Sequence, residues 1–253
     1  MKNFKKMLVL VGIILGTTFS YGEDYKLVSS IGVNGKFSEK KDANLYRGNS
    51  LVYQIPATSE IFRELVKVRD ELKNSKFEKD IILLPVNSYH ITILNGTNET
   101  QSQRKYGFFP KDMDLTSSIF EVHQHFYSKL VNAIETGEIK IKPIKFKIVN
   151  FDTKYGFSPT LEPATEDDYN YLWELREKFS DILQIKRPSF YEDKFHISMA
   201  YLYKNFSQEE KIEYQKLADK LYENFSMKEL VVDEIAFVIF NDMLSYSPLL
   251  ILK

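Results

Sequence analysis

The stretch SYHITIL, residues 88–94, places a histidine in the middle of an apolar run that has the composition of a buried strand. The stretch KFHISMAYL, residues 194–202, repeats this arrangement much later in the chain. Each contains an aromatic residue, a histidine, an isoleucine and then a threonine or serine. A lone histidine in a strand is most often a core residue. Here two of the 4 histidines in the chain, His90 and His196, occur in matching patterns, which favours a shared function.

Alternation along a strand predicts where these side chains point. Successive side chains of a strand lie on opposite faces, so each histidine shares a face with the hydroxyl residue two positions later. The two sets are His90, Thr92 and Leu94 in the first stretch, and His196, Ser198 and Ala200 in the second. The flanking aromatic residues Tyr89, Phe195 and Tyr201 are then expected on the opposite, buried face.

If both strands line one cleft, two imidazoles and two hydroxyls face a single space. This set suits phosphoryl transfer without a metal ion, because histidine titrates near neutral pH and serves both as base and as acid. One neutral histidine would take a proton from the attacking oxygen, and the other, protonated, would give one to the leaving oxygen. Thr92 and Ser198 would bond the non-bridging phosphate oxygens.

The remaining pattern predicts alternating helices and strands. Helical spacing of apolar residues and capping signals predict helices over 58–75 and 117–136, and helices that begin at Thr165 and Ser207. Strands are expected at 50–55, 81–85, 141–151, 229–240 and 248–253. Residues 23–49 are expected to be loosely structured, and residues 95–118 to form a long loop.

The first 22 residues have the composition of an export signal. Lys2, Lys5 and Lys6 precede a short apolar run at 7–16, and Ser20 and Gly22 suit cleavage after Gly22. The run is shorter than the ~20 apolar residues of a membrane-spanning helix. We therefore expect residues 1–22 to be a signal peptide, residues 23–253 to be one exported domain in the periplasm or outside the cell, and no stable membrane association after cleavage. An uncleaved anchor is the alternative.

Composition narrows the chemistry further. The chain has 0 cysteines, which excludes disulfides, thiolate nucleophiles and thiolate metal sites. Its net charge of −1 gives no overall attraction to nucleic acid, so duplex DNA is not an expected partner and any phosphodiester must be bound locally.

Other residues carry weaker signals. His123 and His125 have the spacing of a chelating pair, but in a helix positions two apart point in different directions, so no metal site is expected. His123 falls on the apolar side of that helix and His125 on the polar side. Arg187 could hold phosphate through its guanidinium group or form a loop salt bridge, and Tyr191 is a second candidate for substrate binding.

The paired motifs and the blocks around them resemble a known family. The blocks are GNSLVYQIP, LLPVNSYHITILNG, YGFSPTLEPAT and RPSFYEDKFHISMAYL. Together they resemble a bacterial and fungal branch of the two-histidine (2H) phosphoesterase superfamily, which includes LigT-like RNA ligases and cyclic phosphodiesterases. The resemblance implies a bilobal α+β fold in which two antiparallel sheets flank a central cleft, with helices outside and one motif strand from each lobe.

The same resemblance implies an activity without cofactors. It is metal-independent hydrolysis of 2′,3′-cyclic phosphates or 2′–5′ phosphodiesters in nucleotides or short RNA. By this resemblance His196 would be the base and His90 the acid. Ser198 in place of threonine fits the pattern, whereas an export signal is less usual in such proteins. Two alternatives stay open: a catalytically silent domain that binds a nucleotide or phosphorylated ligand, and an envelope structural protein in which both histidines are buried.

Overall fold

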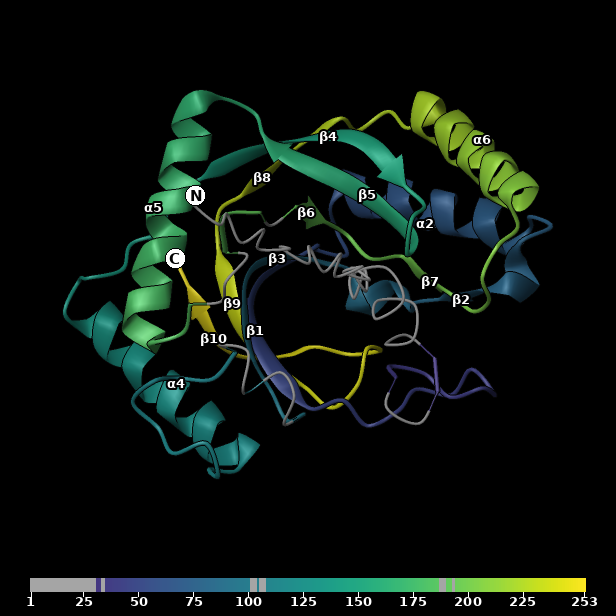
Figure 1. Ribbon diagram of the computed structural model, residues 1–253. Coiled ribbons are helices and arrows are strands. Elements are labelled where there is room, and N and C mark those ends of the chain that lie inside the picture. The colour runs from purple at the N-terminus through teal and green to yellow at the C-terminus, as the bar shows by residue number, and fades with distance from the viewer. Residues whose placement is uncertain (1–30, 33–34, 101–103, 105–107, 187–189, 193) are drawn as a thin grey trace, which may run out of the picture.

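The computed structural model describes residues 31–32, 35–100, 104, 108–186, 190–192 and 194–253. In this part of the chain, two antiparallel sheets are flanked by four α-helices (Figure 1). The strands are β1 (Gly48–Gln54), β2 (Ile81–Leu83), β3 (His90–Asn98), β4 (Ile144–Asp152), β5 (Gly156–Pro163), β6 (Phe195–His196), β7 (Ala200–Leu202), β8 (Glu229–Val232), β9 (Ile235–Phe240) and β10 (Ser247–Leu252). The helices are α2 (Glu60–Lys73), α4 (Ile119–Glu135), α5 (Glu166–Leu183) and α6 (Gln208–Asn224).

The sheet order separates the two motifs and confirms the expected α+β class. One sheet has the order β10-β9-β1-β3 and contains the first motif. The other has the order β2-β7-β5-β4-β8, with β6 paired to β5, and contains the second motif. Neither sheet is a continuous piece of chain, because β1 pairs with β9, and β2 pairs with β7. Each sheet therefore contributes one motif strand, as predicted.

Local sequence explains the helices. In α2 the residues that recur at helical spacing, Ile61, Leu65, Val68 and Leu72, are all buried, as expected. Each helix begins after a serine or threonine whose side-chain oxygen accepts a backbone N–H of the first turn. These cap residues are Ser59, Ser118, Thr165 and Ser207. The four predicted helices are confirmed, and the predicted strands are present with shifted ends. The strand β5, in contrast, was not predicted.

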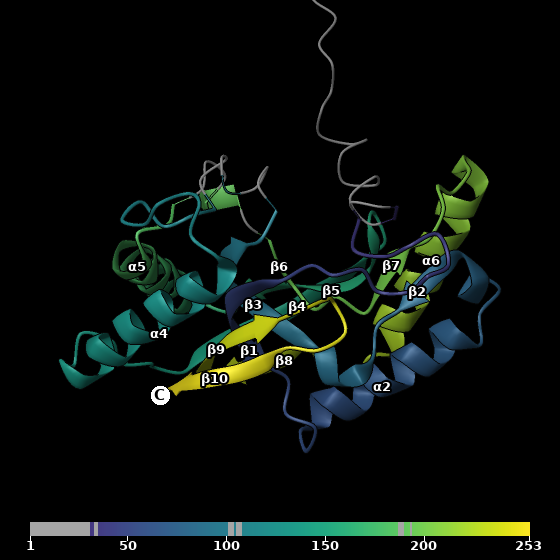
Figure 2. The same ribbon diagram turned by 90° about the horizontal axis from the view of Figure 1, so that it is seen from below.

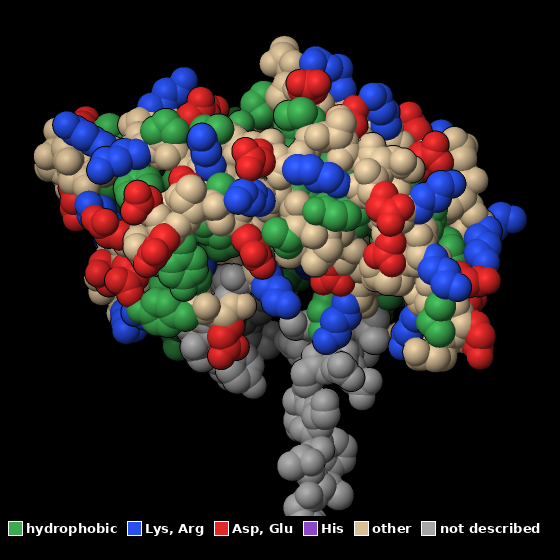
Figure 3. Space-filling view, turned by 90° about the horizontal axis from the view of Figure 1, so that it is seen from above, with side chains coloured by type: hydrophobic (Ala, Val, Ile, Leu, Met, Phe, Trp, Pro, Cys, Tyr) green, Lys and Arg blue, Asp and Glu red, His purple; other side chains and the backbone are tan. Residues whose placement is uncertain are grey.

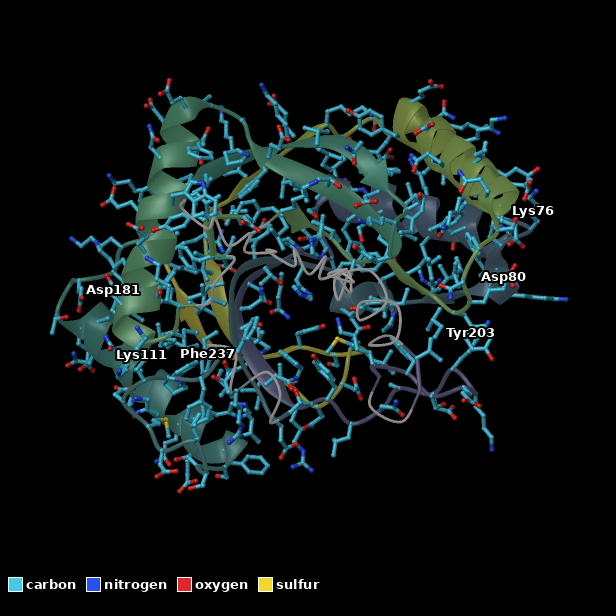
Figure 4. The ribbon with its side chains drawn as sticks, in the orientation of Figure 1. Lys76, Asp80, Lys111, Asp181, Tyr203 and Phe237 are labelled. Atoms are coloured by element: carbon cyan, nitrogen blue, oxygen red, sulfur yellow. The ribbon has the colours of Figure 1, made fainter. Side chains whose placement is uncertain are left out.

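The helices lie at opposite ends of the two sheets. Helices α4 and α5 lie together at one end, and α2 and α6 at the other (Figures 1 and 2). Lys76, labelled in Figure 4 just beyond α2, forms an ion pair with Glu213 of α6. Next to it, the buried ring of Phe77 contacts Phe206 and Tyr214, with centroid separations of 5.5 and 4.8 Å. The segment that follows α2, before the first motif, therefore packs against the lobe that holds the second.

The segment before β1 is organised, which corrects the expectation of loose structure for its described residues. Phe37 is 1% exposed and forms single β-bridges with Ile31 and Ala43. The Asn44 amide donates to the carbonyls of Gly32 and Gly35 at 2.8 and 3.0 Å. A buried aromatic ring and a bonded asparagine thus fold this segment back on itself.

The predicted signal peptide, residues 1–22, lies outside the described residues. Among the described residues, no helix is long and apolar enough to cross a bilayer. Basic and acidic side chains are interspersed over the described surface visible in Figure 3, in keeping with the net charge of −1. In the predicted long loop, Phe109 is 5% exposed, so it anchors the loop.

Candidate active site

The first motif has the alternation that the sequence predicts, up to its threonine. His90 and Thr92 are half-buried, whereas the residues between and before them are buried. Gln54 lies directly opposite His90 in the β1–β3 ladder. Beyond Thr92 the register shifts by one residue, so that Ile93 and Leu94 are both buried. The prediction that Leu94 shares the face of His90 is therefore wrong.

The second motif shows the same alternation and the same interruption. His196 is exposed and Ser198 half-buried, while Ile197 and Met199 are fully buried. The strand breaks between β6 and β7, and Ala200 is buried next to Met199. Tyr201 is consequently half-buried, which corrects the prediction that it lies in the core.

A single β-bridge between Ile91 and Ile197 joins the two motifs. The bridge is antiparallel, so the neighbours of these isoleucines point to the other face and pair in reverse order. His90 therefore lies across from Ser198, and Thr92 across from His196. We call this junction, the bridge with the two motifs around it, the seam. The bridge thus brings the two motifs together, and the convergence of their imidazoles and hydroxyls on one substrate stays a prediction.

The two imidazoles are held in the same way. Nδ1 of His90 lies 2.7 Å from the carbonyl oxygen of Ser88, and Nδ1 of His196 lies 3.1 Å from that of Lys194. A carbonyl oxygen only accepts hydrogen bonds, so Nδ1 carries the proton in both rings. In each neutral ring Nε2 then has the free lone pair. The motifs thus present two equivalent nitrogens that accept or donate a proton.

Burial lowers the pKa of both motif histidines below the usual value of a free imidazole. Burial lowers the pKa of His90 to about 4, and the positive charges of His196 and Lys36 act in the same direction. Burial also lowers the pKa of His196, with a further contribution from Lys36, while Asp152 opposes the shift. Both side chains retain some contact with solvent. Even so, the surrounding protein atoms make desolvation the largest cause of the lowered pKa of His90 and of His196.

Two aromatic residues border the seam. The Tyr246 ring lies 4.1 Å from the His90 ring between centroids, and its backbone carbonyl accepts a hydrogen bond from Gln54 at 2.9 Å. In the second motif stretch, the Tyr201 hydroxyl accepts a hydrogen bond from Lys36 at 3.0 Å. Sequence reasoning did not select Lys36 or Tyr246. An Asn-Gly pair, a sequence typical of turns, precedes Lys36 and is the one sequence signal near it.

The unpredicted strand β5 contributes another hydroxyl. Thr160 lies directly opposite His196 in the β5–β6 ladder, and directly opposed residues of an antiparallel pair project to the same face. Thr160 is half-buried, like Thr92 and Ser198. The face around His196 is therefore richer in hydroxyl groups than the motifs alone predict.

Of the two residues predicted to bind substrate, Arg187 lies outside the described residues. Tyr191 packs on Trp173, and its hydroxyl contacts Glu177 of α5 and Lys186. The structure therefore gives Tyr191 partners near α5, and its role in substrate binding stays a prediction.

The α4 histidines occupy the two faces that the sequence predicts. His123 is 8% exposed, and His125 contacts Asp112 at 3.1 Å on the surface. Among the described residues, no group of three or more histidine, aspartate or glutamate side chains is placed to hold a metal ion.

Comparison with known proteins agrees with this arrangement. Residues 36–154, which include the first motif, match the family described as "2H-phosphodiest: Domain of unknown function (DUF1868)". The conserved protein of unknown function ATU0111 from Agrobacterium tumefaciens str. C58 has a similar structure, with a TM-score of 0.76 and 20% identity over 90% of this chain and 97% of its own. None of the curated proteins matches the sequence.

Two further solved structures are more distant. TT0787 of Thermus thermophilus has a TM-score of 0.47 and 13% identity over 81% of this chain and 96% of its own. The apo form of Escherichia coli LigT has a TM-score of 0.45 and 12% identity over 82% of this chain and 97% of its own.

Two antiparallel sheets each contribute a His-x-Thr or His-x-Ser strand to one seam. The match over residues 36–154 supports the 2H phosphoesterase superfamily for this chain.

Proposed function

We propose that this protein is a metal-independent phosphodiesterase that hydrolyses 2′,3′-cyclic phosphates or 2′–5′ linkages in nucleotides or short RNA. The observation that supports the proposal is the Ile91–Ile197 bridge, which joins the two motif strands. Two histidines with free Nε2 atoms and adjacent hydroxyls supply a base, an acid and hydrogen-bond donors for a phosphoryl group.

In the proposed reaction, neutral His196 takes a proton from water through Nε2 while the water oxygen bonds to phosphorus. The phosphorus–oxygen bond to the leaving ribose oxygen breaks, and protonated His90 gives its Nε2 proton to that oxygen. One water is consumed, and a phosphomonoester with a free hydroxyl is formed from a cyclic phosphate. Thr92 and Ser198 donate hydrogen bonds to the non-bridging oxygens, where charge builds up.

The lowered pKa values of both histidines predict an acidic optimum. The active form needs one protonated and one neutral imidazole. It is lost above both pKa values, where both are neutral, and below both, where both are charged. We expect kcat/KM, which reports the free enzyme, to be maximal between about pH 4 and 6.5. A bound phosphate anion raises both pKa values, so kcat should be maximal at a higher pH than kcat/KM.

The decisive experiment measures hydrolysis of a panel of 2′,3′-cyclic nucleotides and 2′–5′ dinucleotides in the presence of EDTA. Wild type is compared with His90→Ala and His196→Ala, and with His125→Ala as a matched control on the surface of α4. We expect turnover by wild type and the control, and a loss of about 10²- to 10⁴-fold in each motif variant with melting temperatures unchanged.

Other outcomes separate the alternatives. Inactive wild type that binds a nucleotide with equal affinity when His196 is alanine would indicate a silent binding domain. Loss of stability in both motif variants, without any effect of ligand, would indicate that the histidines are structural. Inhibition by EDTA that added metal reverses would contradict the metal-independent mechanism.

We also propose that the chain is exported. Its support is the basic, apolar and small-residue pattern of residues 1–22. Expression of the full chain in a bacterial host, followed by intact mass measurement of the extracytoplasmic fraction, should give a product that begins at Glu23. A full-length product retained with the membrane would instead indicate an uncleaved anchor.

A further inference from the structure

Lys36 is held in place beside the seam. The next residue, Phe37, is buried, and its ring lies 5.4 Å from that of Tyr201 between centroids. The backbone carbonyl of Lys36 accepts a hydrogen bond from Asn44 at 2.9 Å. Its Nζ lies 3.0 Å from the Tyr201 hydroxyl and 5.8 Å from the centre of the Tyr46 ring. These contacts fix the ammonium group, unlike that of an ordinary surface lysine.

The ammonium of Lys36 lacks an acidic partner among the described residues, where no carboxylate lies within 4.0 Å of it. Its neighbours are a hydroxyl and aromatic rings. Burial lowers the pKa of Lys36, but Tyr201 and Tyr46 outweigh that effect and the pKa lies above 10.5, so the group is charged at neutral pH. An enclosed cation without a counter-ion costs free energy, and an anion that enters the site relieves this cost.

The charge of Lys36 acts on both catalytic candidates. Its positive field reaches His90 and His196 alike, although the two belong to different sheets. A cation that interacts with both imidazoles lies beside the space where a phosphate between them would sit. Lys36 is therefore placed to donate a hydrogen bond to a non-bridging oxygen of such a phosphate.

We propose that Lys36, positioned by Tyr201, is an anion-binding residue of the seam and bonds a non-bridging oxygen of the phosphoryl group held between His90 and His196. The inference deepens the proposed function and rests on it for the identity of the substrate. The ligand class is a phosphate ester, and inorganic phosphate, which offers the same oxygens, is its simplest probe.

This role couples phosphate binding to proton uptake. Lys36 lowers the pKa of both imidazoles by repelling protons, and a bound phosphate anion would cancel this repulsion. The other charged or titratable groups that act on the two histidines are Asp152, which faces His196, and the histidines themselves, with Tyr246 packed on His90. Removal of the Lys36 charge should therefore raise the pKa of both histidines.

The test uses the full mature chain and two readouts that do not require turnover. Calorimetry measures the affinity for inorganic phosphate, and NMR titration of the imidazole C–H signals measures each histidine pKa. The variants are Lys36→Met, Lys36→Arg and Tyr201→Phe. Lys40→Met, an exposed lysine in the same segment, is the matched control.

For Lys36→Met we expect phosphate affinity to fall about 10- to 100-fold, the range for one hydrogen bond to a charged group, and both motif histidines to titrate at higher pH. Lys36→Arg should retain most of the affinity, Tyr201→Phe should lose less than Lys36→Met, and Lys40→Met should match wild type. Unchanged phosphate affinity and unchanged histidine titration in folded Lys36→Met would overturn the proposal. These effects without any turnover on the nucleotide panel would instead support the anion site and refute the proposed activity.

Discussion

The four histidines form two contrasting pairs, one at the seam and one on α4. His90 and His196 are far apart in the sequence, yet one β-bridge aligns their motifs and each ring is held by the carbonyl two residues before it. His123 and His125 are two residues apart, yet the helix turns them to different faces, one buried and one on the surface. Closeness in sequence therefore says little about shared chemistry, whereas a repeated pattern says more.

The largest effect should come from removing both seam histidines together. If His90 and His196 act in one chemical step, the double variant His90→Ala/His196→Ala should lose about as much kcat as the worse single variant, about 10²- to 10⁴-fold. Independent contributions would multiply to roughly 10⁴- to 10⁸-fold. Single-turnover rates on the substrate found in the panel decide between these outcomes, and a multiplicative loss would contradict a shared step.

The motif hydroxyls should have a smaller effect. Thr92→Ala and Ser198→Ala should each lower kcat about 10²-fold, the lower range for loss of one donor to a developing oxyanion, with KM little changed. Thr116→Ala, in an exposed turn, is the control. A rise in KM with constant kcat would show that these hydroxyls bind the ground state and the transition state equally.

The sequence alone was sufficient to predict the positions of the helices and the two motifs that meet at the seam. Amphipathic spacing and cap residues act within a few positions, so α2, α4, α5 and α6 were predictable from local patterns. The pairing of the two motifs followed from their repetition, because strand alternation fixes the relation of each histidine to its hydroxyl.

The missed features depend on contacts between distant segments. The one-residue shifts at Leu94 and Ala200 come from a bulge against β1 and from the break between β6 and β7, which no local pattern marks. The same break turns Tyr201 toward Lys36. Lys36 itself belongs to a polar segment whose order depends on the burial of Phe37, a tertiary effect.

On α4, the buried histidine should affect stability and not catalysis. His123 is buried, and burial lowers its pKa to about 4, although the Gly48 backbone acts in the opposite direction. The unfolded chain binds a proton near pH 6.5 and the folded chain does not, so stability falls as the pH drops from 6.5 towards 4. At pH 5 the free energy of unfolding is therefore lower by about 2 kcal/mol than at pH 7.5 because of this histidine.

Urea unfolding at pH 7.5 and 5.0 measures this cost. On acidification the free energy of unfolding of His123→Leu should fall by about 2 kcal/mol less than that of wild type. The kcat of the variant should stay within about twofold of the wild-type value. The His90 and His196 contributions are common to both proteins and cancel in the comparison. An equal acid loss in wild type and variant would show that the His123 ring is protonated or solvated in the folded state.

The smallest effect should come from the remaining histidine. His125 and Lys129 both contact Asp112 at the surface, and the Asp112 side chain is 36% exposed. An exposed ion pair contributes about 0.2–1 kcal/mol, and Lys129 remains as a partner for Asp112 when His125 is lost. His125→Ala should therefore change the free energy of unfolding by less than about 0.5 kcal/mol and leave kcat unaltered. A large loss of activity in this variant would place α4 in the catalytic machinery, and the contrast between the two histidine pairs would no longer hold.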